Sequence, residues 1–179
     1  MKIRQAVSFR VRCCVLSMVA LSTLAFSQPI SPASVPAGWR LPDHSEVDQA
    51  WRRSNSTHYL IAHGDFNGDG RLDTAILLVR ADGSGFAPFI ALTRKAGETV
   101  FVQCETTNQM DYLETEGLQV AKRGTYRTVC GKGYRCEPGD KESVTISFDA
   151  IEFFKRDGPS RLIYWNAEKK AFSEVWLSD

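Results

Sequence analysis

Apolar positions along the chain come in short runs separated by segments rich in Gly, Asp, Asn and Pro. The run at residues 74–79, Thr-Ala-Ile-Leu-Leu-Val, is apolar and β-branched and has no polar face. Such a run is typical of a well-buried strand. Similar runs occupy residues 58–63, 86–93 and 99–105, with turn-forming segments at 81–85 and 94–98. Four strands joined in this way predict an antiparallel meander of the size of one propeller blade.

The second half of the chain repeats this pattern less regularly. Apolar runs lie at residues 118–128, 143–148, 160–165 and 172–177, and residues 151–154 either extend the second run or form a short turn. A single meander cannot bury both of its faces, so the two groups of strands are expected to pack on each other. The predicted fold is mainly β, built from antiparallel meander sheets, with one propeller-like blade and a degenerate second half.

One helix is expected, near the N-terminus, over residues 42–51. Val47, Ala50 and Trp51 would form an apolar face at helical spacing. Asp43 or Ser45 could cap the first turn. This helix would cover one face or one edge of the β structure.

Residues 1–27 have the organisation of a signal peptide. Basic residues at positions 2, 4, 10 and 12 precede an apolar run at 13–26, and Ala25-Phe26-Ser27 fits a small-x-small cleavage site. The alternative is an uncleaved membrane anchor, which the shortness of the apolar run disfavours. Residues 28–40, rich in Pro, Ser and Ala, predict a flexible lead-in, and residues 41–179 a single domain. The expected location is periplasmic or secreted, with no membrane anchor after cleavage.

Charge argues against a nucleic-acid partner. The whole chain carries 22 Lys and Arg and 21 Asp and Glu. Removal of residues 1–27 would leave 18 basic against 21 acidic residues, a net charge of −3. No basic stripe is visible in what remains.

Cys104, Cys130 and Cys136 remain after the predicted cleavage. In an oxidising compartment one pair is expected, which leaves one thiol over. Cys130 and Cys136 bracket a short loop with two glycines, so this pairing is favoured. Spacing leaves open a bridge between Cys104 and either of the other two.

Residues 65–73 have the donor pattern of a calcium loop. Side-chain oxygens stand at positions 1, 3, 5 and 9, and a main-chain carbonyl fills position 7; these residues are Asp65, Asn67, Asp69, Asp73 and Arg71. Hard cations such as Ca²⁺ prefer carboxylate, amide and carbonyl oxygens. Gly68 and Gly70 can take the positive φ angles that a wrapped loop needs. The alternative is a hairpin turn that holds no ion.

The residues after this loop exclude an EF-hand. Position 12, where an EF-hand carries a bidentate Glu, is Ile76, and a strand rather than a helix is expected there. The stretch Gly64-Asp65-Phe66-Asn67-Gly68-Asp69-Gly70-Arg71-Leu72-Asp73 resembles the FG-GAP (VCBS, integrin-α-type) repeat. That resemblance covers about one blade and implies that a DxNxDGxxD loop binds Ca²⁺ between the first strands of a β-propeller blade.

No nucleophile-and-base pair or phosphate loop is recognisable, so an enzyme is not expected. The acidic residues Asp111, Glu114 and Glu116 are interpreted as a solvated face. The aromatic residues of the second half are interpreted as core, and the alternative is that some of them line a binding face; they are Phe153, Phe154, Tyr164, Trp165, Phe172 and Trp176.

Three functions remain open. The favoured one is an exported, non-catalytic, calcium-stabilised binding protein, such as a periplasmic inhibitor or immunity protein against a cell-wall hydrolase. The others are an unrecognised hydrolase and a structural or adhesive surface module. Lys132, Tyr134 and Arg135 in the bridged loop are the candidate partner-binding residues, and the alternative is that this loop is only a staple.

Overall fold

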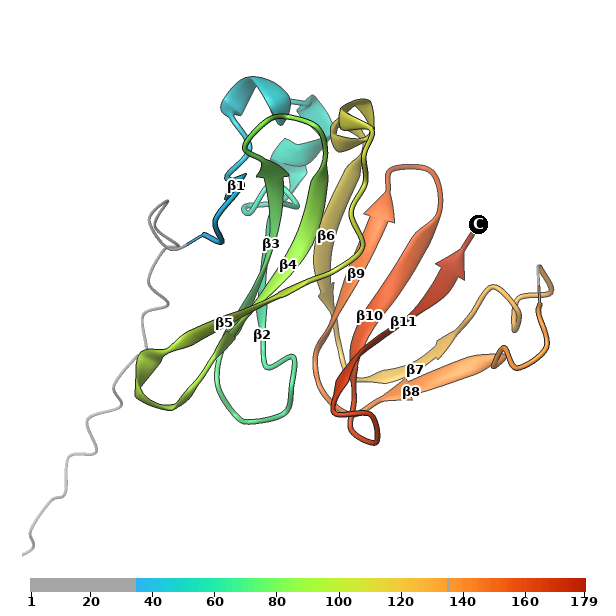
Figure 1. Cartoon of the computed structure of the whole chain (residues 1–179). Coiled ribbons are helices and arrows are strands. Elements are labelled where there is room, and N and C mark those ends of the chain that lie inside the picture. Colours follow the sequence, from blue (N-terminus) through green and yellow to red (C-terminus); the bar gives the residue numbers. More distant parts are fainter. Residues whose placement is uncertain (1–34, 135) are drawn as a thin grey trace, which may run out of the picture.

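Two antiparallel sheets and a separate hairpin make up the domain. The computed structural model describes residues 35–134 and 136–179 (Figure 1). The mainly β, antiparallel architecture predicted from the sequence is confirmed. The predicted signal peptide lies outside the described residues, as do residues 28–34. Within the described part of the chain, no helix has the length and apolar character needed to cross a membrane.

The first sheet contains the predicted meander. Its strands are β2 (Ile61–Gly64), β3 (Asp73–Arg80), β4 (Phe86–Thr93) and β5 (Thr99–Gln103), and η4 (Lys95–Gly97) lies in the last turn. β1 (Trp39–Arg40) shares one edge of β3 with β2, because it pairs with Val79 and Arg80 beyond the end of β2. The folded part of the chain therefore reaches back into the lead-in predicted at residues 28–40.

The second sheet is a meander with an insertion. Its strands are β6 (Glu116–Ala121), β9 (Ala150–Lys155), β10 (Ser160–Asn166) and β11 (Ala171–Ser178), in the order β11-β10-β9-β6. The predicted strand 118–128 breaks into β6 and β7 (Gly124–Arg127). β7 pairs with β8 (Ser143–Ile146) in the separate hairpin. Residues 151–154 are thus the second strand of the sheet itself, and the run at 143–148 lies outside it.

The two sheets meet along β2 and β6 and share one core. The backbone N–H of Leu118 donates a 2.8 Å hydrogen bond to the carbonyl of Tyr59, just before β2. Buried side chains from both sheets form the main cluster; those on β3, β4, β6, β9 and β10 are Ala75, Leu77, Val79, Phe86, Ile90, Leu92, Leu118, Ile151, Phe153 and Ile163. Each large apolar side chain buried in this way contributes roughly 1.5–3 kcal/mol. The curvature of the sheets around this core is visible in Figure 1.

The helix predicted over residues 42–51 is wrong as a continuous helix. Two 3₁₀ turns take its place, η2 (His44–Glu46) and η3 (Ala50–Ser54). The carboxylate of Glu46 accepts the backbone N–H of Asp43 at 2.7 Å and binds both terminal nitrogens of Arg40 at 2.7 Å. These bonds close a single turn, and Val47, with φ −137°, leaves the helical conformation immediately after it.

The predicted strand 58–63 begins three residues later than expected. His58 and Tyr59 have φ angles of 54° and 57°, in the left-handed region that non-glycine residues rarely adopt. The ring of Tyr59 stacks on Trp51, with ring centroids 5.4 Å apart, and meets Phe154 edge-on at the same distance. Phe154 follows the core residue Phe153 on β9, so this aromatic packing lies on the face of the second sheet away from the main core. It holds the ring of Tyr59 at the point where the backbone is left-handed.

Candidate functional site

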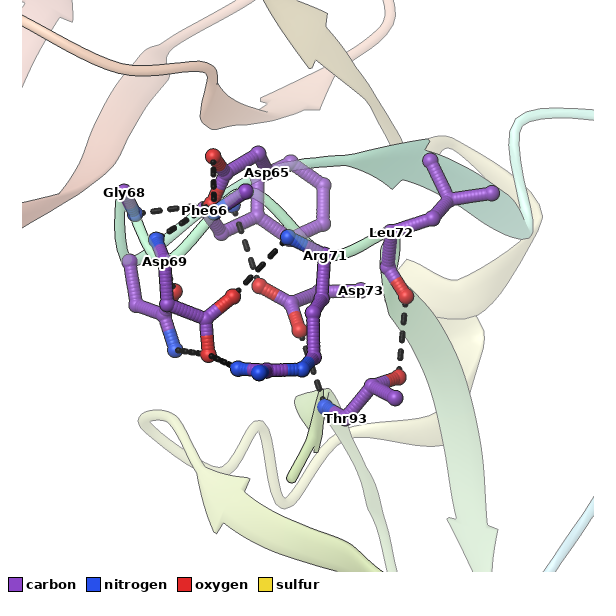
Figure 2. Close-up of polar contacts among 10 residues, drawn as sticks. Asp65, Phe66, Gly68, Asp69, Arg71, Leu72, Asp73 and Thr93 are labelled. Carbon is purple, nitrogen blue, oxygen red and sulfur yellow. Dashed lines mark hydrogen bonds and ion pairs between the residues drawn. The ribbon is translucent and has the colours of Figure 1, made fainter. Parts of the chain in front are cut away.

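The loop between β2 and β3 is organised around the carboxylate of Asp65. One oxygen accepts the backbone N–H groups of Gly68 at 2.8 Å and Asp69 at 3.1 Å, and the other accepts that of Gly70 at 2.9 Å. Figure 2 shows these bonds at the centre of the loop. A single side chain thus satisfies three backbone donors and fixes the turn.

Asp69 and Arg71 form the outer part of the loop. One oxygen of Asp69 accepts the backbone N–H of Arg71 at 2.9 Å, and the other pairs with the Arg71 guanidinium at 3.0 Å. Desolvation acts to raise the pKa of Asp69, but these hydrogen bonds and the charge of Arg71 outweigh it, so the pKa is lowered. Asn67 accepts the backbone N–H of Asp69 at 3.0 Å.

Asp73 anchors the loop to the sheet from a fully buried position. Its two oxygens accept the backbone N–H groups of Phe66 at 3.1 Å and of Thr93, on β4, at 2.9 Å. Desolvation raises the pKa of Asp73, and the charges of Asp65 and Asp69 add to this effect, although both hydrogen bonds favour the carboxylate. Asp73 is therefore a buried acid that neighbouring acids make harder to ionise.

The positive φ angles expected at Gly68 and Gly70 are confirmed, at 76° and 78°. The two positions differ in their surroundings. A Cβ atom on Gly68 would lie 2.3 Å from the ring of Phe148, whereas a Cβ atom on Gly70 would meet open space. The loop is thus packed at Gly68 against the connection between β8 and β9.

The donor chemistry of this loop fits a hard cation, because nine consecutive residues supply carboxylate, amide and carbonyl oxygens. The side chains are nevertheless engaged with backbone N–H groups and with Arg71. Among the described residues, no three His, Cys, Asp or Glu side chains come together as a metal site. Calcium binding by Asp65, Asn67, Asp69, Asp73 and the carbonyl of Arg71 therefore stays a prediction.

The disulfide predicted between Cys130 and Cys136 is confirmed. Cys104 is the free cysteine of the described chain and is partly buried. Desolvation raises the pKa of its thiol to about 12. Cys104 is therefore a protonated thiol at neutral pH, which is a poor nucleophile.

The bridged loop is docked on the last strand, β11. The backbone N–H of Val129 donates to the carbonyl of Trp176 at 3.0 Å, and the ammonium group of Lys132 donates to the carbonyl of Leu177 at 2.6 Å. Tyr134 is 62% exposed. Arg135 lies outside the described residues. Of the three candidate partner-binding residues, Lys132 holds the loop in place and Tyr134 projects into solvent.

A cleft that the sequence analysis did not identify lies between the segment after β5 and the ends of β9, β10 and β11. Its volume is about 520 Å³, within the range of small-molecule sites. The residues that matter most for its chemistry are Glu105, Tyr112, Glu116, Lys155, Arg161 and Trp176. The segments that border it can be followed in Figure 1.

Arg161 forms the floor of this cleft and is only 4% exposed. Its Nη1 atom pairs with Glu105 and, at 3.5 Å, with Glu174. Its guanidinium carbon lies 5.1 Å from the centroid of the Phe153 ring and 5.6 Å from that of the Trp176 ring. Nε has no hydrogen-bond partner among the described residues.

The interpretation of Glu116 as part of a solvated face is wrong. Glu116 is the first residue of β6 and pairs with Lys155 on β9. Desolvation raises the pKa of Glu116 to about 7, although the charges of Arg161 and Lys155 act to lower it. Its Oε2 atom is buried and lacks a partner in the described chain. The alternation of side chains along a strand could have indicated this burial, because Glu116 lies two residues before the buried Leu118 and so shares its face of the sheet.

The interpretation of Trp176 as core is also wrong, because its side chain is 48% exposed. Phe153, by contrast, is buried as expected.

In comparisons with known proteins, no family model, no curated protein sequence and no solved structure matches this chain. The resemblance to the FG-GAP repeat therefore rests on the loop residues alone.

Proposed function

We propose that this protein is an exported, non-catalytic binding protein that recognises a protein partner through its bridged loop, with bound calcium stabilising the scaffold. The observation that carries this proposal is the exposure of Tyr134, at 62%, on a loop that is fixed at several points. Tyr is among the residue types that are enriched at interaction hot spots.

The loop is organised before any partner arrives. The Cys130–Cys136 disulfide closes it, and the bonds from Val129 and Lys132 attach it to β11. A segment that is already ordered loses little conformational entropy on association, so more of its contact energy appears as affinity. Arg135, next to Tyr134 in sequence, adds the other residue type that dominates hot spots.

Calcium supports the scaffold in this proposal, at the loop between β2 and β3. Asp73 is buried, and its pKa is raised by desolvation and by its acidic neighbours Asp65 and Asp69. A cation bound by the loop would offset this unfavourable charge. Among the described residues, the ion pair of Arg71 is with Asp69.

The proposed partner is a cell-wall hydrolase, which the protein blocks as an inhibitor or immunity protein. This choice rests on fold-level analogy, because some small periplasmic inhibitors resemble the calcium-bearing modules to which residues 64–73 are similar.

The test is an inhibition assay. Residues 28–179 are titrated into purified muramidases, amidases and endopeptidases that release soluble fragments from peptidoglycan. We expect saturable inhibition of one class, at least tenfold weaker for Tyr134→Ala. Leu72→Ala is the matched control, because Leu72 is an exposed apolar residue on the calcium loop. Failure to inhibit any class would contradict the proposed partner, and fragment release by the protein alone would favour the hydrolase alternative.

A further inference from the structure

The cleft floored by Arg161 is lined by none of the described residues of the bridged loop. We propose that it binds a saccharide, whose hydroxyl groups are held by Arg161 and Glu116 and whose ring packs on Trp176. This proposal is independent of the bridged loop and its protein partner.

Two unsatisfied polar atoms give the first step. Nε of Arg161 is an N–H donor and Oε2 of Glu116 is a carboxyl oxygen, and neither has a hydrogen-bond partner among the described residues, although both are buried. Leaving such atoms unpaired costs free energy, so in native structures a protein group, an ordered water, an ion or a ligand usually pairs with them. A hydroxyl group satisfies either atom, because it both donates and accepts.

The charged side chains in and beside the cleft narrow the class of ligand that it can bind. The guanidinium of Arg161 is already paired with Glu105 and Glu174. The ammonium of Lys155 lies 4.5 Å from the centroid of the Tyr112 ring. With Glu116 added, opposite charges are interspersed along the cleft, which therefore lacks the excess positive charge that would hold a phosphate. A neutral ligand with many hydroxyl groups fits this arrangement better than an anion.

Aromatic surface completes the site. Trp176 is 48% exposed and Tyr112 is 38% exposed, and both line the cleft. The C–H face of a pyranose ring packs against such rings, while its hydroxyl groups point outward to polar side chains. Asn108 and Gln109, which also line the cleft, supply amide donors and acceptors at its edge.

Trp176 links the cleft to the bridged loop through different atoms. Its side chain lines the cleft, and its backbone carbonyl accepts the N–H of Val129. Replacing the side chain leaves that backbone bond available. The two proposed sites can therefore be separated with single substitutions.

The experiment uses the mature chain, residues 28–179, labelled with ¹⁵N. Chitotriose, cellotriose and maltotriose are titrated separately, and the Trp176 indole N–H signal is followed by NMR. We expect saturable shifts of that signal for at least one trisaccharide. Because Trp176→Ala has no indole N–H at this position, binding by every variant is also followed through the backbone amide signals of the residues that line the cleft. Trp176→Ala and Glu116→Gln should each weaken binding of that trisaccharide at least tenfold, whereas Tyr134→Ala should leave it unchanged. The same Tyr134→Ala protein should lose inhibition of the hydrolase, so failure of one proposal is distinguishable from failure of the other.

Glu116→Gln keeps the proposal falsifiable if Trp176→Ala does not fold, because the amide has the shape of the carboxyl group. Absence of shifts at Trp176 with all three sugars up to about 20 mM, a concentration at which binding would release only about 2 kcal/mol, would overturn the proposal. Glycylglycine, a zwitterion that could pair with Arg161 and Glu116, is titrated in parallel. Shifts with glycylglycine and none with the sugars would overturn it in favour of a peptide-terminus site.

Discussion

Nη2 of Arg52 donates a 2.7 Å hydrogen bond to the backbone carbonyl of Glu116. The same fully buried guanidinium donates to the backbone carbonyl groups of His58 and Leu113 and to the side-chain oxygen of Gln49. Desolvation lowers the pKa of Arg52 to about 10, which still leaves it charged at neutral pH. One cation thus ties η3 to η5 (Met110–Glu114) and to the first residue of β6, and so holds the cleft carboxyl group in place.

Arg52→Ala is expected to lower the free energy of unfolding by about 3 kcal/mol or more, because it leaves the backbone carbonyl groups of His58, Leu113 and Glu116, which are buried or partly buried, without this donor. Arg53→Ala is the matched control. Arg53 is exposed and makes one 3.2 Å bond, to the carbonyl of Asp48, so its replacement should cost less than about 0.5 kcal/mol. Urea unfolding followed by fluorescence measures both, and equal effects would contradict the role assigned to Arg52.

Gly68 and Gly70 give a paired test of the loop. Gly70→Ala adds only the cost of a left-handed non-glycine residue, about 1 kcal/mol. Gly68→Ala adds the same cost plus a clash with the Phe148 ring, for a total of about 2–4 kcal/mol. Thermal melts of the two variants should therefore differ clearly. Equal melting temperatures would show that Phe148 moves aside without cost.

Calcium is expected to raise the melting temperature. A ligand that binds only the folded state adds about 2.7 kcal/mol at a hundredfold excess over its Kd. Asp69→Ala should abolish the shift between EDTA and millimolar Ca²⁺, since it removes a central carboxylate. Asp82→Ala, in the turn between β3 and β4, should keep the shift, because Asp82 accepts the N–H of Ser84 outside the loop. A wild-type melt identical in EDTA and in Ca²⁺ would contradict the calcium prediction.

Much of the fold could be predicted because it depends on local pattern. The apolar run of β3 and the turns on either side of β4 placed the first meander correctly, and loop spacing favoured the correct disulfide. The N-terminal helix could not be predicted correctly, because Arg40 and Glu46 close its first turn through a contact that helical periodicity does not reveal.

The cleft was missed for a different reason. Arg161 and Glu105 are 56 residues apart, and their pairing depends on how the second sheet faces the segment after β5. Glu116 stands beside other acidic residues in the sequence, which favoured a solvated interpretation. Its burial follows from the pairing of β6 with β9, and the strand that was expected to begin at residue 118 did not extend back to Glu116, so the alternation was not applied to it.

The raised pKa of Glu116 predicts a pH-dependent stability. Because desolvation raises this pKa from 4.5 to about 7, the folded protein keeps a proton that the unfolded chain releases between these values. The free energy of unfolding should therefore fall as pH rises through that window. The pKa of about 7 already includes the opposing charges of Lys155 and Arg161, and the partial exposure of Glu116 reduces the expected fall to about 1–2 kcal/mol.

Glu116→Gln is the variant that isolates this effect. The amide resembles the protonated acid, so both proteins should have similar stability at pH 5, and the variant should be the more stable at pH 8. The raised pKa of Asp73 adds a dependence of the same sign, but it is present in both proteins and cancels in the difference. Urea unfolding at pH 5, 6, 7 and 8 measures that difference. Parallel stability curves for the two proteins would show that Glu116 titrates as an ordinary solvated acid.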